Sequence, residues 1–366
     1  MSKYVVMLTE FLLDFGLDVV VITSSCETTC NGLVVRRTPP VEDSFFSVVA
    51  NVLHNSRIIQ KERKELGVDV FHSQGTYSFL ADVVTMHSCH KAAIKAINRI
   101  SAVEYNLVQR PLYRTARWVL PLNVQALIVE KKVLEKSKKI ISVSEGVKKE
   151  ILDNYNISEE KINVIPNGVD LNEFKPNKEK RGKTREQLKI DENEVVLMFS
   201  GYEFKRKGLR YIIEALPKIK GDVKLLVVGK DDPEPYRKLA SKLGVIDKVI
   251  FMGFVQDISE CYAASDIFVF PTLYEAFSLV TLEAVASGLP ILATKVNGTE
   301  ELIVNGYNGF FIERDGNDIA EKVNILVDDD GLRKKMSKNA RKTARNYSWE
   351  KVARKTLEVY EEVVKR

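Results

Sequence analysis

The second half of the chain predicts an α/β fold with a parallel sheet, because short apolar runs alternate there with helical patterns. Glycines stand where these elements end, at Gly229, Gly244 and Gly288. With 366 residues the chain is long enough for two domains. The strands are predicted at 195–200, 223–228, 249–252, 267–270 and 291–294, and the helices at 209–219, 236–243, 258–264 and 278–287.

The first half is less regular, although apolar residues repeat at helical spacing over 4–15 and Gly16 follows as a cap. Residues 172–190 are polar and lysine-rich, which predicts a linker. Further helices are predicted at 45–64, 92–118, 124–136 and 145–154, and strands at 18–23, 33–36, 68–72, 83–87 and 140–143.

Composition limits the class of protein. The net charge of +5 is too small to indicate a general nucleic-acid binder. The sequence contains no run of 18 apolar residues, so no membrane span is predicted. The N-terminus lacks a signal-peptide pattern, and four scattered cysteines are typical of reduced thiols in the cytoplasm. Cys26 and Cys30 form a spaced pair, for which a metal or redox role is the alternative.

Two glutamates, Glu275 and Glu283, lie where the predicted strand 267–270 passes into the helix 278–287. Open α/β sheets bind ligands at such a passage. Free amides at the start of the helix favour an anion, and a carboxylate on each side suits hydroxyl groups. A site that binds sugar hydroxyls, then a diphosphate, then ribose hydroxyls would suit a nucleotide-sugar.

The E-x7-E spacing of these glutamates resembles the signature of family GT4, the retaining glycosyltransferases with the GT-B fold. The resemblance is dense over 137–366 and thin before residue 68. Four other matches follow in order: Thr85-Met86-His87 at the N-domain histidine, 164–170 at the interdomain hinge, 201–208 at the donor-phosphate loop and Ser348-Trp349-Glu350 at the C-terminal helix.

This resemblance implies two Rossmann-like domains that face a central cleft. Residues 1–165 with the C-terminal helix 349–366 form the acceptor side, and residues 166–348 bind the nucleotide-sugar. The chain begins at the helix that follows the family's first strand, so that strand is expected to be missing. Either the product is short or its start lies upstream of Met1, which bears on acceptor binding.

By the same resemblance, Arg206 and Lys207 stabilise the departing diphosphate, since charged donors bind phosphate oxygens strongly. Tyr202 stands where the family has an arginine. Glu275 is expected to hold sugar hydroxyls and Glu283 the ribose diol. The alternatives are a solvated charge run for the cations, and surface positions for the carboxylates.

His87 is expected to contact the transferred sugar. A histidine satisfied within the fold is the alternative, and a zinc site with Cys89 and His90 lacks a fourth ligand. His72 is predicted to pack at a strand end, and 297–301 to form a structural turn. The other residues expected to bind the donor are Gly201, Phe254, Val255, Phe277, Ser278, Leu279 and Val280.

No metal or cofactor is expected, and Asp328-Asp329-Asp330 is interpreted as a solvated turn at a helix end. The predicted reaction is a retaining hexosyl transfer from a UDP- or GDP-sugar to a glycan or lipid-linked acceptor. Segment 91–118 is basic and amphipathic, which indicates either contact with an anionic membrane or a helix over the acceptor side. This segment is most similar to the lipopolysaccharide-core glucosyltransferase branch.

Two rival functions share this architecture. One is a non-catalytic GT-B subunit or scaffold, and the other is a nucleotide-sugar 2-epimerase. A nicotinamide dehydrogenase and a P-loop NTPase are disfavoured, because neither Gly-x-Gly nor G-x4-G-K-[ST] occurs in the sequence.

Overall fold

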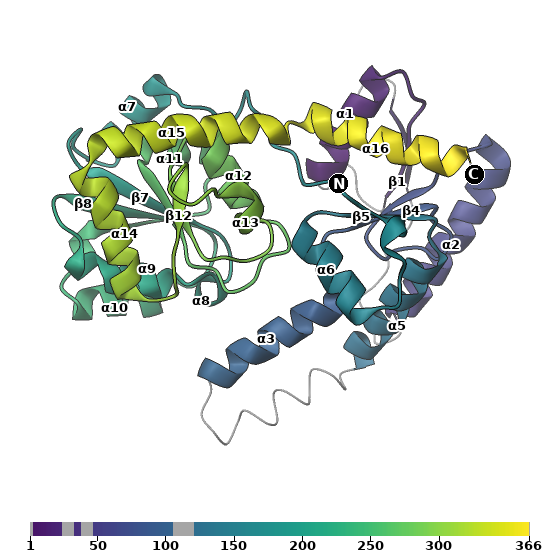
Figure 1. Cartoon of the computed structure of the whole chain (residues 1–366), viewed down its shortest axis with the longest axis horizontal. Helices are drawn as coiled ribbons and strands as arrows, with labels where there is room; N and C mark the ends of the chain where they lie inside the picture. Colours follow the sequence, from purple (N-terminus) through teal and green to yellow (C-terminus); the bar gives the residue numbers. More distant parts are fainter. Residues whose placement is uncertain (1–2, 24–32, 38–46, 105–120, 366) are drawn as a thin grey trace. The chain divides into compact units, whose positions relative to one another are not determined.

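The computed structural model describes residues 3–23, 33–37, 47–104 and 121–365 (Figure 1). The chain divides into two compact units. Unit 1 comprises Met1–Gly168 and Trp349–Arg366, and unit 2 comprises Val169–Ser348. None of the helices in the described ranges combines the length and the hydropathy that crossing a bilayer requires.

Unit 2 is built on a six-stranded parallel sheet, as the alternating pattern predicts. Its strand order is β9-β8-β7-β10-β11-β12, so the direction of winding reverses between β7 and β10. Such a reversal is the topological switch point at which open α/β sheets bind ligands. The strands are β7 Val195–Ser200, β8 Val223–Val228, β9 Val249–Gly253, β10 Ile267–Phe270, β11 Ile291–Ala293 and β12 Gly309–Phe311.

Helices cover both faces of this sheet. In Figure 1, α9, α10 and α14 lie on one side, and α11, α12 and α15 lie on the other. Both β7 and β10 are buried along their whole length, which explains their unbroken apolar sequences. The helices are α7 Lys178–Gln187, α8 Phe204–Lys207, α9 Leu209–Ala215, α10 Glu234–Lys242, α11 Ile258–Ala264, α12 Leu279–Ala286, α13 Thr299–Leu302, α14 Gly316–Asp328 and α15 Asp330–Ala344.

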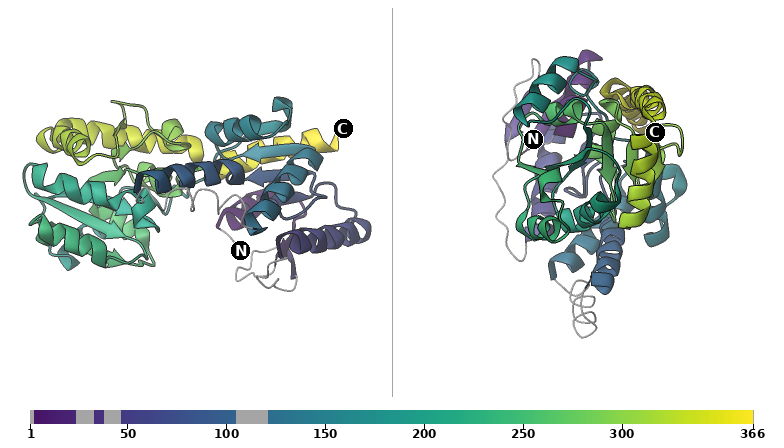
Figure 2. Two further views of the ribbon diagram at one scale, coloured as in Figure 1. Left: turned by 90° about the horizontal axis from the view of Figure 1, so that it is seen from below. Right: turned by 90° about the vertical axis from the view of Figure 1, so that its left-hand side faces the viewer.

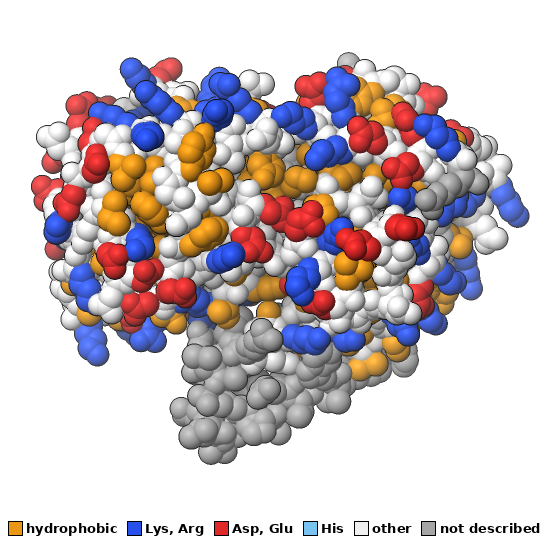
Figure 3. Space-filling view, in the orientation of Figure 1, with side chains coloured by type: hydrophobic (Ala, Val, Ile, Leu, Met, Phe, Trp, Pro, Cys, Tyr) orange, Lys and Arg blue, Asp and Glu red, His pale blue; other side chains and the backbone are white. Residues whose placement is uncertain are grey.

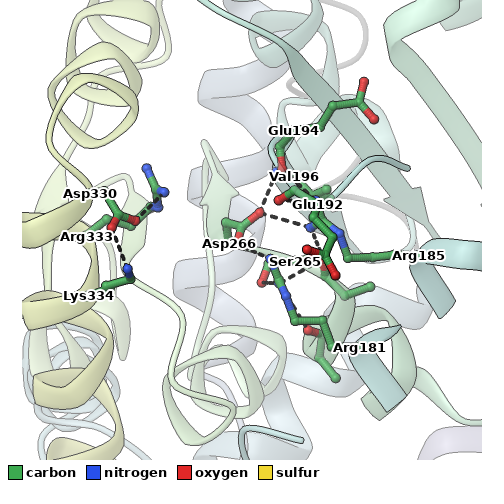
Figure 4. Close-up of polar contacts among 12 residues, drawn as sticks. Arg181, Arg185, Glu192, Glu194, Val196, Ser265, Asp266, Asp330, Arg333 and Lys334 are labelled. Atoms are coloured by element: carbon green, nitrogen blue, oxygen red, sulfur yellow. Dashed lines mark hydrogen bonds and ion pairs between the residues drawn. The ribbon is translucent and has the colours of Figure 1, made fainter. Parts of the chain in front are cut away.

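The predicted linker at 172–190 is wrong, because its centre forms helix α7, which packs on α11. Two arginines make this packing. The guanidinium of Arg185 is 5% exposed and donates to Asp266 at 3.3 Å and to the carbonyl of Ala264 at 3.0 Å. Arg181 donates to the other oxygen of Asp266 at 2.8 Å (Figure 4). The polar composition of this segment therefore does not reveal that it forms a helix with a charged inward face.

Unit 1 contains two parallel sheets, β1-β2 and β3-β4-β5-β6. Helix α1 is the first described element and precedes β1, as predicted. The strands are β1 Val20–Thr23, β2 Val34–Arg37, β3 His72–Gln74, β4 Val83–Met86, β5 Lys139–Ser142 and β6 Ile162–Val164. The helices are α1 Lys3–Asp14, α2 Ser47–Leu66, α3 His90–Glu104, α5 Pro121–Lys136, α6 Glu145–Asn154 and α16 Trp349–Val364. The left view of Figure 2 shows strands between helices.

The C-terminal helix α16 returns to unit 1 and lies beside α1, as the resemblance implies. Leu8 and Leu12 of α1 are buried in one cluster with Val352 and Trp349 of α16. Gly168 makes room for the indole, since a Cβ there would lie 2.5 Å from a ring carbon of Trp349.

Several boundaries differ from the predictions. The strand predicted at 68–72 begins only at His72, and the three-residue strands β6 and β12 were not predicted. Helix α3 is described as far as Glu104, so the rest of segment 91–118 lies outside the described residues, as do Cys26 and Cys30. Basic and acidic side chains are interspersed on the face shown in Figure 3, in line with the small net charge.

Replacing Arg185 with Leu should lower the free energy of unfolding by about 3 kcal/mol, because it removes a nearly buried guanidinium that pairs with Asp266 and donates to three backbone carbonyl oxygens. The matched control is Arg210→Leu, which breaks the exposed pair with Glu214 and should cost less than about 1 kcal/mol. Urea unfolding of the two variants measures both values. Equal losses would show that α7 is not held by the buried pair.

Candidate active site

The loop after β7 places a lysine at the switch point. Gly201 ends the strand with φ of 151°, and a Cβ at this position would lie 2.5 Å from Cδ of Lys207. The lysine stem therefore crosses the glycine backbone directly. Its Nζ lies 4.8 Å from the ring centroid of Phe270 on the neighbouring strand β10. This close approach is the physical reason for a glycine at the strand end.

Glu275 forms an ion pair with this lysine from the other side of the switch point. Its Oε1 accepts hydrogen bonds from Nζ of Lys207 at 2.9 Å, from Nη1 of Arg206 at 3.3 Å and from Oγ1 of Thr272 at 2.9 Å. The carboxylate is 12% exposed. One oxygen thus gathers two cations from the β7 loop and a hydroxyl from the end of β10.

Arg206 also contacts the segment that contains Glu275. Besides Glu275, its Nη1 donates to the carbonyl oxygen of Tyr274, and its Nε donates to Glu203 at 2.9 Å. Glu203 has a left-handed backbone, with φ of 56°, where the chain turns into α8. Such a conformation costs on the order of 1 kcal/mol in a residue other than glycine. The turn points both cations toward the end of β10.

The start of α12 lies next in the chain. Ser278 is its N-cap, and its hydroxyl accepts from the amide of Thr281 at 3.3 Å. Ser278 and Phe277 are buried, whereas Leu279 is about half exposed. Gly298 closes this site, because a Cβ there would lie 2.7 Å from Cα of Phe277. The helix N-terminus is therefore tightly packed on one side and open at Leu279.

Glu283 lies one turn into α12 and is held by a tyrosine that sequence reasoning missed. The hydroxyl of Tyr262 is 3.0 Å from both Oε2 of Glu283 and the carbonyl oxygen of Val280. Burial raises the pKa of Tyr262, and the neighbouring carboxylate of Glu283 adds to this shift, so the phenol stays protonated and donates. In the sequence, Tyr262 looks like any other aromatic residue in the core.

The remaining predicted positions in unit 2 are separate from these contacts. Phe254, at the end of β9, is 68% exposed, and Val255 beside it is half-buried. The three aspartates form a helix junction, as predicted. Asp329 caps α15 by accepting from the amide of Leu332, and Asp330 pairs with Arg333 and Lys334 (Figure 4).

In unit 1, His87 follows β4 and is half-buried. Its Nε2 lies 3.1 Å from Oε1 of Gln74, and its ring contacts Tyr4 edge-on at 4.9 Å. Burial lowers the pKa of His87 to about 4. Cys89 is buried with its thiol toward the carbonyl of Glu150. Within the described ranges, no three His, Cys, Asp or Glu side chains form a group suited to a metal ion.

Two lysines of the basic segment contact the end of α6. Nζ of Lys91 donates to the carbonyl oxygen of Asn154 at 3.1 Å, and Nζ of Lys95 donates to its side-chain oxygen at 2.5 Å. Both lysines therefore help to pack α3 on α6. The membrane hypothesis for 91–118 depends on residues beyond this contact.

Comparisons with known proteins give the class to which this fold and site belong. The model for "Glycosyl transferases group 1" matches residues 180–343, and the model for "Glycosyltransferase Family 4" matches residues 1–173. The structure of WaaG, a glycosyltransferase involved in lipopolysaccharide biosynthesis, is similar with a TM-score of 0.75 and 23% identity. The superposition covers 98% of this chain and 95% of that one, which shows the GT-B fold.

The sequence relatives agree. The uncharacterized glycosyltransferase MJ1607 of Methanocaldococcus jannaschii is 29% identical over 96% of this chain and 92% of its own length. The N,N'-diacetylbacillosaminyl-diphospho-undecaprenol alpha-1,3-N-acetylgalactosaminyltransferase of Campylobacter jejuni is 31% identical, over 59% of this chain and 58% of its own length. The chain belongs to the family 4 glycosyltransferases.

Two partly buried histidines, His72 and His87, make stability depend on pH. Burial lowers the pKa of His72 to about 3 and that of His87 to about 4, from 6.5. Below pH 6.5 the unfolded chain binds protons that the folded chain does not, so the free energy of unfolding should fall as the pH drops from 6.5 to 4. The expected slope is about 1.4 kcal/mol per pH unit for each histidine.

Urea unfolding of the wild type and of His87→Asn between pH 7 and 4 isolates this contribution. The pH dependence of the free energy of unfolding should be weaker in the variant by the contribution of one histidine between pH 6.5 and 4, and the slopes of the two proteins should agree near pH 7. Parallel curves for the two proteins would contradict the assignment.

Proposed function

We propose that this glycosyltransferase moves a hexosyl group from a UDP- or GDP-sugar to a hydroxyl of a glycan or lipid-linked acceptor, with retention and without a metal ion. The observation that carries the proposal is the contact of Arg206 and Lys207 with Glu275 at the switch point of unit 2. Two fixed cations beside a helix N-terminus suit a departing diphosphate.

We assign each group a role that its position supports. Arg206 and Lys207 neutralise charge that develops on the diphosphate as the bond to the sugar breaks. Glu275, placed by these cations and by Thr272, holds hydroxyls of the sugar. Glu283, fixed by Tyr262, accepts from the ribose diol. The exposed ring of Phe254 and the backbone at Val255 receive the base.

We assign unit 2 to the nucleotide-sugar and unit 1, with His87, to the sugar and the acceptor. A lipid-linked acceptor is supported by the Campylobacter jejuni relative, whose name includes a diphospho-undecaprenol acceptor. Contact of 91–118 with an anionic membrane would suit such a substrate. A cytoplasmic location, at the inner face of the membrane, accords with the buried free thiols of Cys89 and Cys261.

The function is tested by calorimetric binding of UDP, GDP, ADP and their common sugar conjugates, with release of the nucleoside diphosphate followed in the same samples. Selective binding with slow release supports the proposal and names the base. Turnover should persist in excess EDTA. Loss of turnover that Mg²⁺ or Mn²⁺ restores would overturn metal independence, and binding without turnover on any acceptor would favour the scaffold.

The two glutamates should separate by function. Glu275→Gln should abolish sugar transfer and leave nucleotide affinity nearly unchanged, because it weakens the contacts to the sugar hydroxyls and leaves both cations and Glu283 in place to bind the nucleotide. Glu283→Ala should weaken nucleotide binding by about 1–3 kcal/mol, since a carboxylate that bonds to the ribose is lost. Calorimetry and initial rates measure both effects.

Glu321→Gln, which alters only an exposed pair with Lys322, is the control and should change neither quantity. If the two site variants behave alike, the assignment of sugar end and ribose end is wrong.

A further inference from the structure

A line of partly buried polar side chains in unit 1 connects the C-terminal helix to His87. His72, on β3, lies with Nδ1 2.6 Å from the hydroxyl of Tyr360 on α16 and with Nε2 2.7 Å from Oγ1 of Thr85 on β4. Gln74, two residues further along β3, lies between the two imidazoles. Its Nε2 is 3.2 Å from Nε2 of His72, and its Oε1 is 3.1 Å from Nε2 of His87.

This arrangement restricts where the histidine protons reside. A carboxamide donates only from its nitrogen and accepts only at its oxygen. Gln74 can therefore satisfy both imidazoles only if one Nε2 is protonated and the other is bare. In the structure the amide nitrogen faces His72 and the amide oxygen faces His87. Nε2 is accordingly bare in His72 and protonated in His87.

Both rings are also kept neutral. Burial lowers the pKa of His72 to about 3, with a further contribution from His87, and burial lowers the pKa of His87 to about 4. A neutral imidazole carries one proton, so a proton on Nε2 leaves a lone pair on Nδ1. The ring of His87 is partly exposed, and Nδ1 has no hydrogen-bond partner among the described residues.

We propose that Gln74 is a positioning residue that fixes the tautomer of His87, so that Nδ1 is presented as a hydrogen-bond acceptor to a hydroxyl of the transferred sugar. The part that concerns the sugar rests on the proposed function, whereas the tautomer does not. A neutral acceptor nitrogen receives a hydroxyl and has no proton to offer a carboxylate. The arrangement therefore favours a neutral hexose over a uronic acid at this position.

The tautomers are measured by long-range ¹H–¹⁵N NMR of the full-length protein labelled in its four histidines. His72→Asn and His87→Asn assign the signals. At pH 7 the wild type should show a proton on Nε2 of His87 and on Nδ1 of His72. Gln74→Leu should convert the His87 signals to those of a mixture, and Gln60→Leu on the exposed face of α2 should change nothing.

Gln74→Glu is the second variant, in case the leucine variant fails to fold. A carboxylate accepts from both Nε2 atoms, so both histidines should carry the proton there, and both should become charged at a higher pH than in the wild type. In the transfer assay, Gln74→Leu should lower kcat about tenfold and reduce the preference for a neutral hexosyl donor over its uronic acid counterpart, with nucleotide affinity unchanged.

A proton on Nδ1 of His87 in the wild type, the same Nε2 state in both rings, or His87 signals unchanged in both Gln74 variants would overturn the role of Gln74. Failure of the wild type to bind any nucleotide-sugar would instead overturn the proposed function, and the NMR result would still decide the tautomer.

Discussion

The contact of Lys207 and Arg206 with one oxygen of Glu275 is the interaction on which the rest of the site depends. It spans the single place in unit 2 where the winding of the sheet reverses, because the cations follow β7 and the carboxylate follows β10. Each partner depends on one neighbouring residue for its position. The lysine needs Gly201, and the carboxylate needs the hydroxyl of Thr272. The sheet topology brings the two sides of this contact together.

Around His87 in unit 1 the hydrogen bonds join neutral groups, in contrast to the ionic contact in unit 2. The direction of each bond is set by which atoms carry hydrogens. His72 and Gln74 both belong to the short strand β3, while Tyr360 comes from a helix 288 residues away in the chain. The return of α16 to this unit thus completes a hydrogen-bond network as well as an apolar core.

The sequence predicted the parallel sheet of unit 2 well, because its long buried strands are unbroken apolar runs between glycines. It failed at α7, whose inward face consists of arginines that apolar periodicity does not detect. It missed β6 and β12, which are too short to have a pattern. The grouping of Arg206, Lys207 and Glu275 was predictable from their places after strands. The supporting contacts of Tyr262, Thr272 and Gln74 were not, because they depend on side-chain geometry across elements.

The shared carboxylate has a consequence for how the site responds to salt. Glu275 offsets part of the charge of Arg206 and Lys207, two side chains that are only 20% and 11% exposed. Under the proposed function, an incoming diphosphate would meet cations whose charge is already partly offset, so few counterions from solution would be displaced. Nucleotide affinity at such a site would depend less on salt concentration than at an open group of lysines, where screening acts fully. The protein would therefore retain its donor over a wide range of ionic strength.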